Sequence, residues 1–132
     1  MSLQNWRVLD FEGLFGRVQD GASMPEQLEA IEEMVTMIRG ESLHRIVLDL
    51  DHADIDLGQR VVQIQPQALA EGMVKAGLSR FALVHRGEVE VWWSDLLKST
   101  RQLGIDTCAF TAADAAIEWI CADGEDSLSQ SG

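Results

Sequence analysis

The sequence predicts one α/β domain: a small mixed, mainly parallel sheet of about five strands with about four helices. Three observations predict this fold class. Helical patterns alternate with short apolar, β-branched runs, glycines follow the helical patterns at Gly40, Gly77 and Gly104, and 132 residues are enough to bury one core. Strands that are joined by helices in this way form right-handed crossovers and therefore pair in parallel.

The N-terminal segment Asn5–Val18 has the pattern of a β-hairpin. Apolar and polar residues alternate on either side of a turn signal at Glu12-Gly13. We expect these antiparallel strands at an edge of the sheet. Exposed apolar residues on an edge strand, such as Leu14 and Phe15, would make a homodimer plausible.

The first helix has both a start and a stop signal. Ser23-Met24-Pro25-Glu26 has the form of a capping box, in which the serine oxygen and the glutamate carboxylate bond to backbone N–H groups. Gly40 is expected to end the helix in a left-handed conformation. The predicted buried face of the helix consists of Leu28, Ile31, Val35 and Ile38.

The later elements repeat this alternation. Short apolar runs predict strands over Arg45–Leu50, Arg80–Val84 and Ile105–Phe110. Helices are predicted over Val61–Ala76, over Val89–Leu103 and from a second capping-box-like start at Thr111-Ala112-Ala113-Asp114. Their expected inner faces are Ile64, Ala68, Leu69 and Met73; Trp93, Leu96, Leu97 and Thr100; and Ala116, Ile117, Trp119 and Ile120.

The domain is expected to span residues 1–122. The acidic tail, residues 123–132, has almost nothing to bury and should be mobile. Cys108 and Cys121 lie among apolar neighbours and have no Cys-x-x-Cys spacing, so they are expected to be buried, reduced thiols.

The net charge of −12, with 22 acidic and 10 basic residues, narrows the choice of partners. A polyanion would be repelled, so nucleic acid and anionic membrane surfaces are poor partner candidates, and a basic protein or a cation is expected instead. No apolar run reaches the roughly 18 residues that span a bilayer, and the N-terminus has no signal-peptide pattern. We therefore expect a cytoplasmic protein that does not insert into membranes.

Ligands of open α/β sheets bind outside the carboxyl ends of the strands. Three places meet that condition: the segment from Asp51 to Gly58, the segment from His85 to Gly87, and Thr111. The expected binding residues there are Asp51, Asp54, Asp56, Gly58 and His85. Neither a metal nor a cofactor is expected, because the histidines His44, His52 and His85 have no partner at ligand spacing.

The pair Asp49 and Asp51 leaves a catalytic alternative open. Haloacid-dehalogenase-like phosphatases place Asp-x-Asp directly after an apolar strand, where one carboxylate attacks phosphorus and Mg²⁺ screens the charge. Such enzymes also need a later lysine and a downstream acidic pair, whereas Lys75 and Lys98 both fall within predicted helices. The spacing of the aspartates also differs from that of a helix-loop-helix calcium site.

Trp92 and Trp93 are adjacent on a predicted helix and point about 100° apart, so both cannot face the centre of the core equally. A half-exposed tryptophan near Phe81 would suit a protein partner or a small apolar or lipid-like ligand. The other interpretation is that both indoles pack inside.

Four segments resemble the STAS-like group, which is related to bacterial anti-sigma-factor antagonists. They are Val47-Leu48-Asp49-Leu50, Asp56-Leu57-Gly58, Arg80-Phe81-Ala82-Leu83-Val84 and Ile117-Glu118-Trp119-Ile120. The resemblance covers nearly the whole chain and implies a small sheet with helices packed beside it, and a surface for a protein partner or an apolar groove. In the antagonists a serine of an Asp-Ser-Ser-Gly turn is phosphorylated. The matching stretch Asp56-Leu57-Gly58 has no serine, so that phosphoswitch is absent.

The leading hypothesis is a non-enzymatic, STAS-like regulatory or interaction domain whose contact surface includes the loop from Asp51 to Gly58. A binder of a small apolar or lipid-like ligand near Trp92 and Trp93 is the second hypothesis. Mg²⁺-dependent phosphotransfer through Asp49 and Asp51 is the third.

Overall fold

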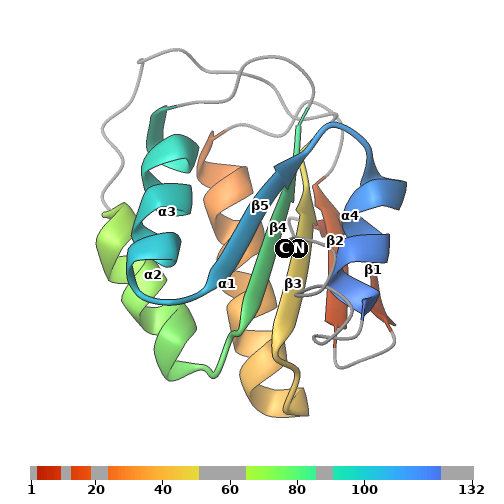
Figure 1. Ribbon diagram of the computed structural model, residues 1–132, viewed down its shortest axis with the longest axis horizontal. Coiled ribbons are helices and arrows are strands. Elements are labelled where there is room, and N and C mark those ends of the chain that lie inside the picture. Colours follow the sequence, from red (N-terminus) through yellow and green to blue (C-terminus); the bar gives the residue numbers. More distant parts are fainter. Residues whose placement is uncertain (1–2, 10–12, 19–23, 51–64, 86–90, 123–132) are drawn as a thin grey trace, which may run out of the picture.

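The computed structural model describes residues 3–9, 13–18, 24–50, 65–85 and 91–122 (Figure 1). These residues form one five-stranded mixed sheet and four helices, so the predicted α/β class is confirmed. In chain order the elements are β1 (Leu3–Leu9), β2 (Gly13–Val18), α1 (Met24–Glu41), β3 (Arg45–Asp49), α2 (Pro66–Lys75), β4 (Arg80–Val84), α3 (Val91–Gln102), β5 (Asp106–Phe110) and α4 (Ala113–Cys121).

The order of the strands in the sheet is the same as their order in the chain, β1-β2-β3-β4-β5. β1 and β2 form the predicted antiparallel hairpin, and every later neighbour is parallel. Right-handed crossovers that always step toward the same edge return over the same face of the sheet. α1, α2 and α3 accordingly cover one face, whereas α4, which follows the last strand, covers the other (Figure 1).

The sheet separates two hydrophobic clusters. The larger cluster joins one face of the sheet to α1, α2 and α3, and Ile46, Leu48, Phe81 and Leu83 are its central strand residues. The smaller cluster lies under α4 and consists of Phe15, Val47, Ala82, Val84, Ala116 and Ile120. The alternation of strand side chains between these clusters explains the consecutive apolar residues Ile46–Leu48 in β3 and Phe81–Val84 in β4.

β2 is an inner strand, because it pairs with β1 on one side and with β3 on the other. Leu14 is fully buried and Phe15 is 6% exposed. The expectation that these two residues lie exposed on an edge strand is therefore wrong. Local alternation predicts a hairpin, but it does not say which of its two strands faces the rest of the sheet.

α1 continues past Gly40 and ends at Glu41, so the prediction that Gly40 stops the helix is wrong. Ser42 takes the left-handed conformation instead, with φ of 57°. The backbone N–H of Leu43 donates to the carbonyl of Ile38 at 3.0 Å, and Leu43 is buried. Burial of Leu43 thus fixes the end of the helix, although serine is a poorer left-handed residue than glycine.

α2 begins at Pro66, later than the predicted start at Val61. Gln65 is the extended N-cap residue, with φ of −80° and ψ of 139°, because the residue before a proline is driven out of the helical region. Leu69 and Met73 are buried as predicted, but Ala68 is exposed, since the short helix turns Ala70 inward instead. Gly77 follows the end of this helix, as predicted, and it takes a left-handed conformation with φ of 92°.

The last two helices match their predicted inner faces in most positions. Trp93, Leu96, Leu97 and Thr100 are all buried in α3, which is followed by Gly104 at φ of 93°. In α4, Ala116 and Ile120 are buried, and Ile117 and Trp119 pack partly buried against the same cluster.

The capping-box start predicted at Thr111 is wrong. Ala112 is the N-cap residue of α4, and no side chain caps the helix there. The helix is anchored at its other end, where the Nη1 of Arg45 donates to the carbonyls of Ile120 at 2.7 Å and Ala122 at 3.1 Å.

Arg80 adds a second contact to the same helix end. Its Nη1 donates to the carbonyls of Trp119 at 2.9 Å and Ala122 at 3.1 Å. Its guanidinium carbon lies 5.4 Å from the centroid of the Trp119 ring. Cations at a helix C-terminus satisfy its orphan carbonyls and oppose the negative end of the dipole, so the starts of β3 and β4 hold α4 on the sheet.

Several predictions lie outside the described residues: the cap Ser23, the loop of residues 51–58, the helix positions 61–64 and 89–90, and the tail of residues 123–132. No disulfide joins Cys108 and Cys121, and both are half-buried, so the expectation of full burial is wrong. No helix among the described residues is long and apolar enough to cross a membrane.

Candidate functional site

Asp49 is the acidic side chain that the structure places at the carboxyl end of β3. It pairs across the sheet with Arg17 of β2, and the Nε of Arg17 donates to the Oδ2 of Asp49 at 3.0 Å. The Asp49 side chain is 2% exposed and that of Arg17 is 33% exposed. The carboxylate that the sequence offers as a nucleophile is thus engaged in a part-buried, charge-assisted hydrogen bond.

Two arginines flank the ring of Phe15 next to this ion pair. The guanidinium carbons of Arg7 and Arg17 lie 5.6 Å and 5.8 Å from the Phe15 centroid. These cation–π contacts order the long side chains on the α4 face of β1 and β2. Arg17 is therefore held in the geometry in which it meets Asp49.

His85 follows β4 at the same edge of the sheet, as predicted. Its backbone N–H donates to the carbonyl of Phe110 at 2.9 Å, and the residue is half-buried. Asp51, Asp54, Asp56 and Gly58 lie outside the described residues, so the structure does not place them relative to His85. Within the described ranges, no group of three or more His, Cys, Asp and Glu side chains could hold a metal ion.

The order of the strands bears on ligand binding at this edge. In open α/β sheets the binding crevice forms where the strand order reverses and neighbouring crossovers leave toward opposite faces. The order of the five described strands, β1-β2-β3-β4-β5, has no reversal, and the three crossover helices α1, α2 and α3 share one face. The described part of the sheet therefore does not form that type of crevice.

Trp92 and Trp93 adopt different environments, as the 100° offset requires. Trp93 is fully buried, and its Nε1 donates to the Oε1 of Gln27 in α1 at 2.9 Å. Trp92 is partly buried and packs against the same cluster, with its ring edge-on to Trp93 at a centroid distance of 5.0 Å. Phe81 is also fully buried. These aromatic rings fill the core, and Trp92 alone reaches the surface.

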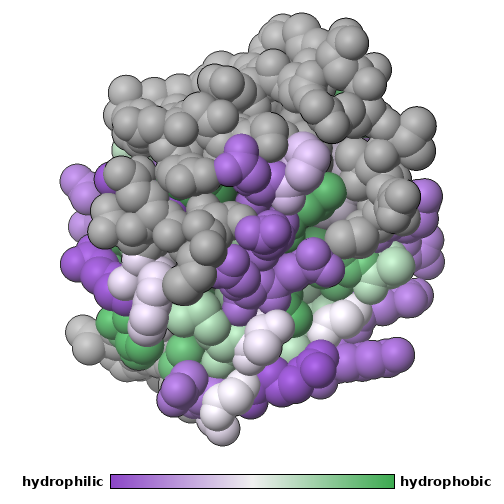
Figure 2. Space-filling view, turned by 180° about the vertical axis from the view of Figure 1, so that it is seen from behind, coloured by the Kyte–Doolittle hydropathy of each residue, from purple (hydrophilic) through white to green (hydrophobic). Residues whose placement is uncertain are grey.

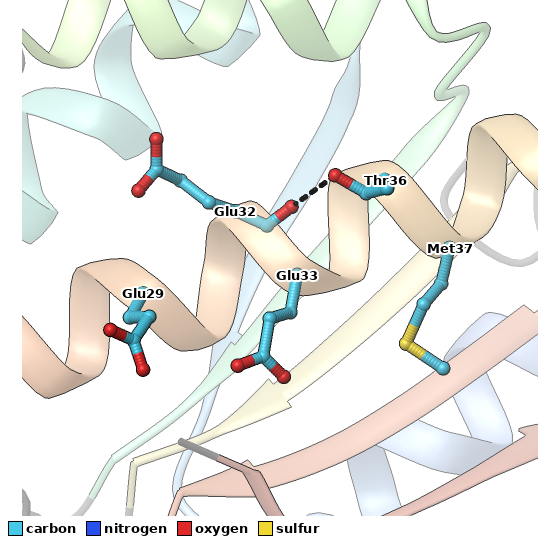
Figure 3. A pocket seen from close by; sticks show the side chains of 5 residues that line it. All are labelled: Glu29, Glu32, Glu33, Thr36 and Met37. Atoms are coloured by element: carbon cyan, nitrogen blue, oxygen red, sulfur yellow. Dashed lines mark hydrogen bonds between the residues drawn. The ribbon is translucent and has the colours of Figure 1, made fainter. Parts of the chain in front are cut away.

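One groove among the described residues lies along α1. It has a volume of about 530 Å³ and is lined by Glu29, Glu32, Glu33, Thr36 and Met37. In Figure 3, Glu29, Glu33 and Met37 point to the side of α1 on which the N-terminal strands lie, and Glu32 points toward the other helices. Thr36 donates to the Glu32 carbonyl at 3.0 Å and so turns its hydroxyl onto the helix.

β1, one of the two edge strands of the described sheet, presents two large apolar side chains to solvent. Trp6 is 48% exposed and Val8 is 56% exposed. Their cross-strand partners are Gly16, which has no side chain to cover the indole, and the buried Leu14. Because directly paired residues share a face, Trp6 and Val8 lie on the α1 face of the sheet.

Sequence reasoning missed the exposure of Trp6 and Val8, although their alternation with Arg7 was visible. Hydrophobic residues reach the surface between groups of hydrophilic ones when the molecule is seen from behind (Figure 2). We call Trp6, Val8 and the groove residues Glu29, Glu33 and Met37 the α1–β1 surface.

No protein-family model matches this chain, and a search of curated proteins finds no match either. Function must therefore be argued from the residues themselves.

Proposed function

We propose that this chain is a non-enzymatic protein-interaction module of the regulatory, STAS-like kind. The observation that carries the proposal is the exposure of Trp6 and Val8 on an edge strand of the described sheet. Tryptophan is among the residues that contribute most to protein interfaces, and a large apolar side chain at a sheet edge favours contact with a partner.

The surroundings of Asp49 support this proposal over phosphotransfer. A nucleophilic aspartate needs an accessible oxygen, but the Asp49 side chain is 2% exposed and its Oδ2 accepts from Arg17. The ion pair gives Asp49 a structural role in joining β2 to β3. Hydrolysis of phosphate esters in Mg²⁺ is therefore expected to stay at the buffer baseline; turnover that Asp49→Asn abolishes would favour the enzyme.

The apolar-ligand alternative has less support than a protein partner. Phe81 and Trp93 are fully buried within the core, and Trp93 is bonded to Gln27. A ligand that inserted between them would have to displace packed side chains and break that bond, at a cost of several kcal/mol. Intrinsic tryptophan fluorescence is expected to stay unchanged on addition of fatty acid or phospholipid.

The capture experiment compares baits that differ only at the surface. The full chain is immobilised and exposed to extract of its own cells, beside a Trp6→Thr/Val8→Thr bait and a bait that carries Asp54→Lys and Asp56→Lys. A Val74→Thr/Leu103→Thr bait is the matched control, because both residues are exposed and apolar but lie elsewhere, at 42% and 40% exposure.

The proposal expects a protein that the wild type and the control retain and that at least one other bait loses. Threonine preserves strand propensity in β1, and near-wild-type circular dichroism of each bait would exclude unfolding as the cause. If all four baits retain the same proteins in the same amounts, those proteins do not bind at Trp6, Val8, Asp54 or Asp56, and the proposal that the exposed residues of β1 carry the interaction is wrong.

A further inference from the structure

Resting on the proposed function, we infer that the α1–β1 surface receives a basic amphipathic helix of a partner protein. The helix would lie beside α1 and next to Trp6 and Val8. Its apolar side would meet Trp6, Val8 and Met37, and its lysines or arginines would meet Glu29 and Glu33.

Among the described elements, no helix lies next to α1 on the side of β1. α1 contacts β2 and, more weakly, β3. Packed helices lie about 8–10 Å apart, which is about two strand spacings of about 4.8 Å. A helix packed at that distance from α1, on the side away from α2 and α3, would therefore lie along the outer edge of β1, next to the exposed Trp6 and Val8.

The wall of the groove has the length and the pattern to meet a helix. Glu29, Glu33 and Met37 are spaced by four residues and form one ridge of α1 that points to this side (Figure 3). The ridge spans about 12 Å, or about two helical turns. Ridges of this spacing pack into the grooves of a neighbouring helix.

Charge selects the chemistry of the partner. The chain carries −12, and three glutamates line the groove beside one apolar side chain, Met37. A basic helix would be steered toward this surface and would pair with the carboxylates at its rim. The flexible side chain of Met37 can adapt to apolar side chains of differing shape.

A second copy of this chain fits the surface less well. Two copies would bring together two strongly acidic surfaces, each lined by the same glutamates. Edge-to-edge pairing of β1 would also meet the register shift between Leu3 and Asn5, which interrupts the regular ladder. A helix that packs beside α1 against Trp6 and Val8 needs no such ladder.

The test uses the full chain and a fluorescein-labelled Leu/Lys peptide of about 18 residues with leucines at helical spacing. A peptide of the same composition with scrambled order controls for charge alone. The amphipathic peptide is titrated by fluorescence polarisation against wild type, Trp6→Thr/Val8→Thr and Glu29→Lys/Glu33→Lys. The controls are Val74→Thr/Leu103→Thr and Glu71→Lys/Glu118→Lys, which make the same changes at exposed sites elsewhere.

The inference expects the amphipathic peptide to bind more tightly than the scrambled one. Both variants at the α1–β1 surface should weaken binding by about tenfold or more, and both controls by less than about twofold. Equal weakening by Glu71→Lys/Glu118→Lys, or no effect of Trp6→Thr/Val8→Thr, would overturn it. So would a dimer in analytical ultracentrifugation that the Trp6→Thr/Val8→Thr variant dissociates, because a second copy would then occupy the surface.

This outcome is separable from that of the capture experiment. One outcome is that the bait with Asp54→Lys and Asp56→Lys fails to retain extract proteins while the peptide binds Trp6→Thr/Val8→Thr as tightly as wild type. The inference about the α1–β1 surface would then be wrong, but the proposal of a protein-interaction module would remain supported. If no bait captures a specific protein, the proposed function itself is wrong.

Discussion

The indole N–H of Trp93 in α3 donates a 2.9 Å hydrogen bond to the Oε1 of Gln27 in α1, and both residues are buried. The two side chains are 66 positions apart in the chain. The bond links α1 to α3, the first and third helices of the layer, and it satisfies a polar group that burial would otherwise penalise.

Gln27→Leu is expected to lower the free energy of unfolding by about 1–3 kcal/mol, because it leaves the buried indole N–H without its acceptor. Urea unfolding followed by circular dichroism measures this loss. The matched control is Gln67→Leu on the exposed side of α2, which should change stability by less than about 0.5 kcal/mol. Equal effects of the two substitutions would contradict a role for the hydrogen bond.

Asp49→Asn tests the ion pair between β2 and β3. The substitution removes the charge that Arg17 meets at 3.0 Å in a part-buried position, and we expect a loss of about 1–3 kcal/mol in urea unfolding. Asp106→Asn is the control, since its carboxylate is 61% exposed and 3.9 Å from Arg80. Exposed pairs of that kind contribute about 0–1 kcal/mol. A smaller effect at Asp49 than at Asp106 would show that the buried pair is dispensable.

Arg45→Gln and Arg80→Gln together are expected to loosen α4 locally. They remove the donors to the carbonyls of Ile120, Trp119 and Ala122, so the helix would open at a free energy lower by about 1–3 kcal/mol. Hydrogen exchange resolved by mass spectrometry should show faster exchange in α4 than in α3. The same substitution at exposed Arg39, on α1 across the sheet, should leave α4 unchanged.

Replacing Gly40 or Gly77 by alanine is expected to change the free energy of unfolding in opposite directions. Gly40→Ala should raise the free energy of unfolding by about 0.5–1 kcal/mol, because Gly40 lies inside α1 and an added Cβ would meet nothing within 4 Å. Gly77→Ala should lower it by about 1–2 kcal/mol, because φ is +92° there and the new Cβ would lie 3.3 Å from the Nδ1 of His44. Thermal unfolding of both variants measures these changes. If Gly77→Ala stabilised the protein, the claim that the positive φ at residue 77 requires glycine would be wrong.

The parts of the fold that the sequence predicts best depend on local periodicity. The inner face of α3, with Trp93, Leu96, Leu97 and Thr100, follows directly from spacing along one helix. The strands Arg80–Val84 and Asp106–Phe110 likewise follow from short apolar runs between helices. These signals need no knowledge of the rest of the chain.

The wrong predictions concern positions whose structure depends on residues far away in the sequence. Gly40 has the local signature of a helix stop, but the buried Leu43 moves the end to Ser42. Thr111 resembles a cap, yet α4 is held at its far end by arginines from β3 and β4. The position of Leu14 inside the sheet, and of Trp6 outside it, depends on strand order, which no local pattern contains.

The contacts of Arg45 and Arg80 with the end of α4 also bear on the order in which the parts of the domain fold during synthesis. Every strand pairs with its immediate predecessor in the chain, so the sheet can lengthen one strand at a time as residues emerge from the ribosome. Arg45 and Arg80 emerge early, but the carbonyls that they bind belong to residues 119–122. Their docking therefore follows the pairing of all five described strands, and a nascent chain stalled before residue 119 would lack these contacts between α4 and the sheet.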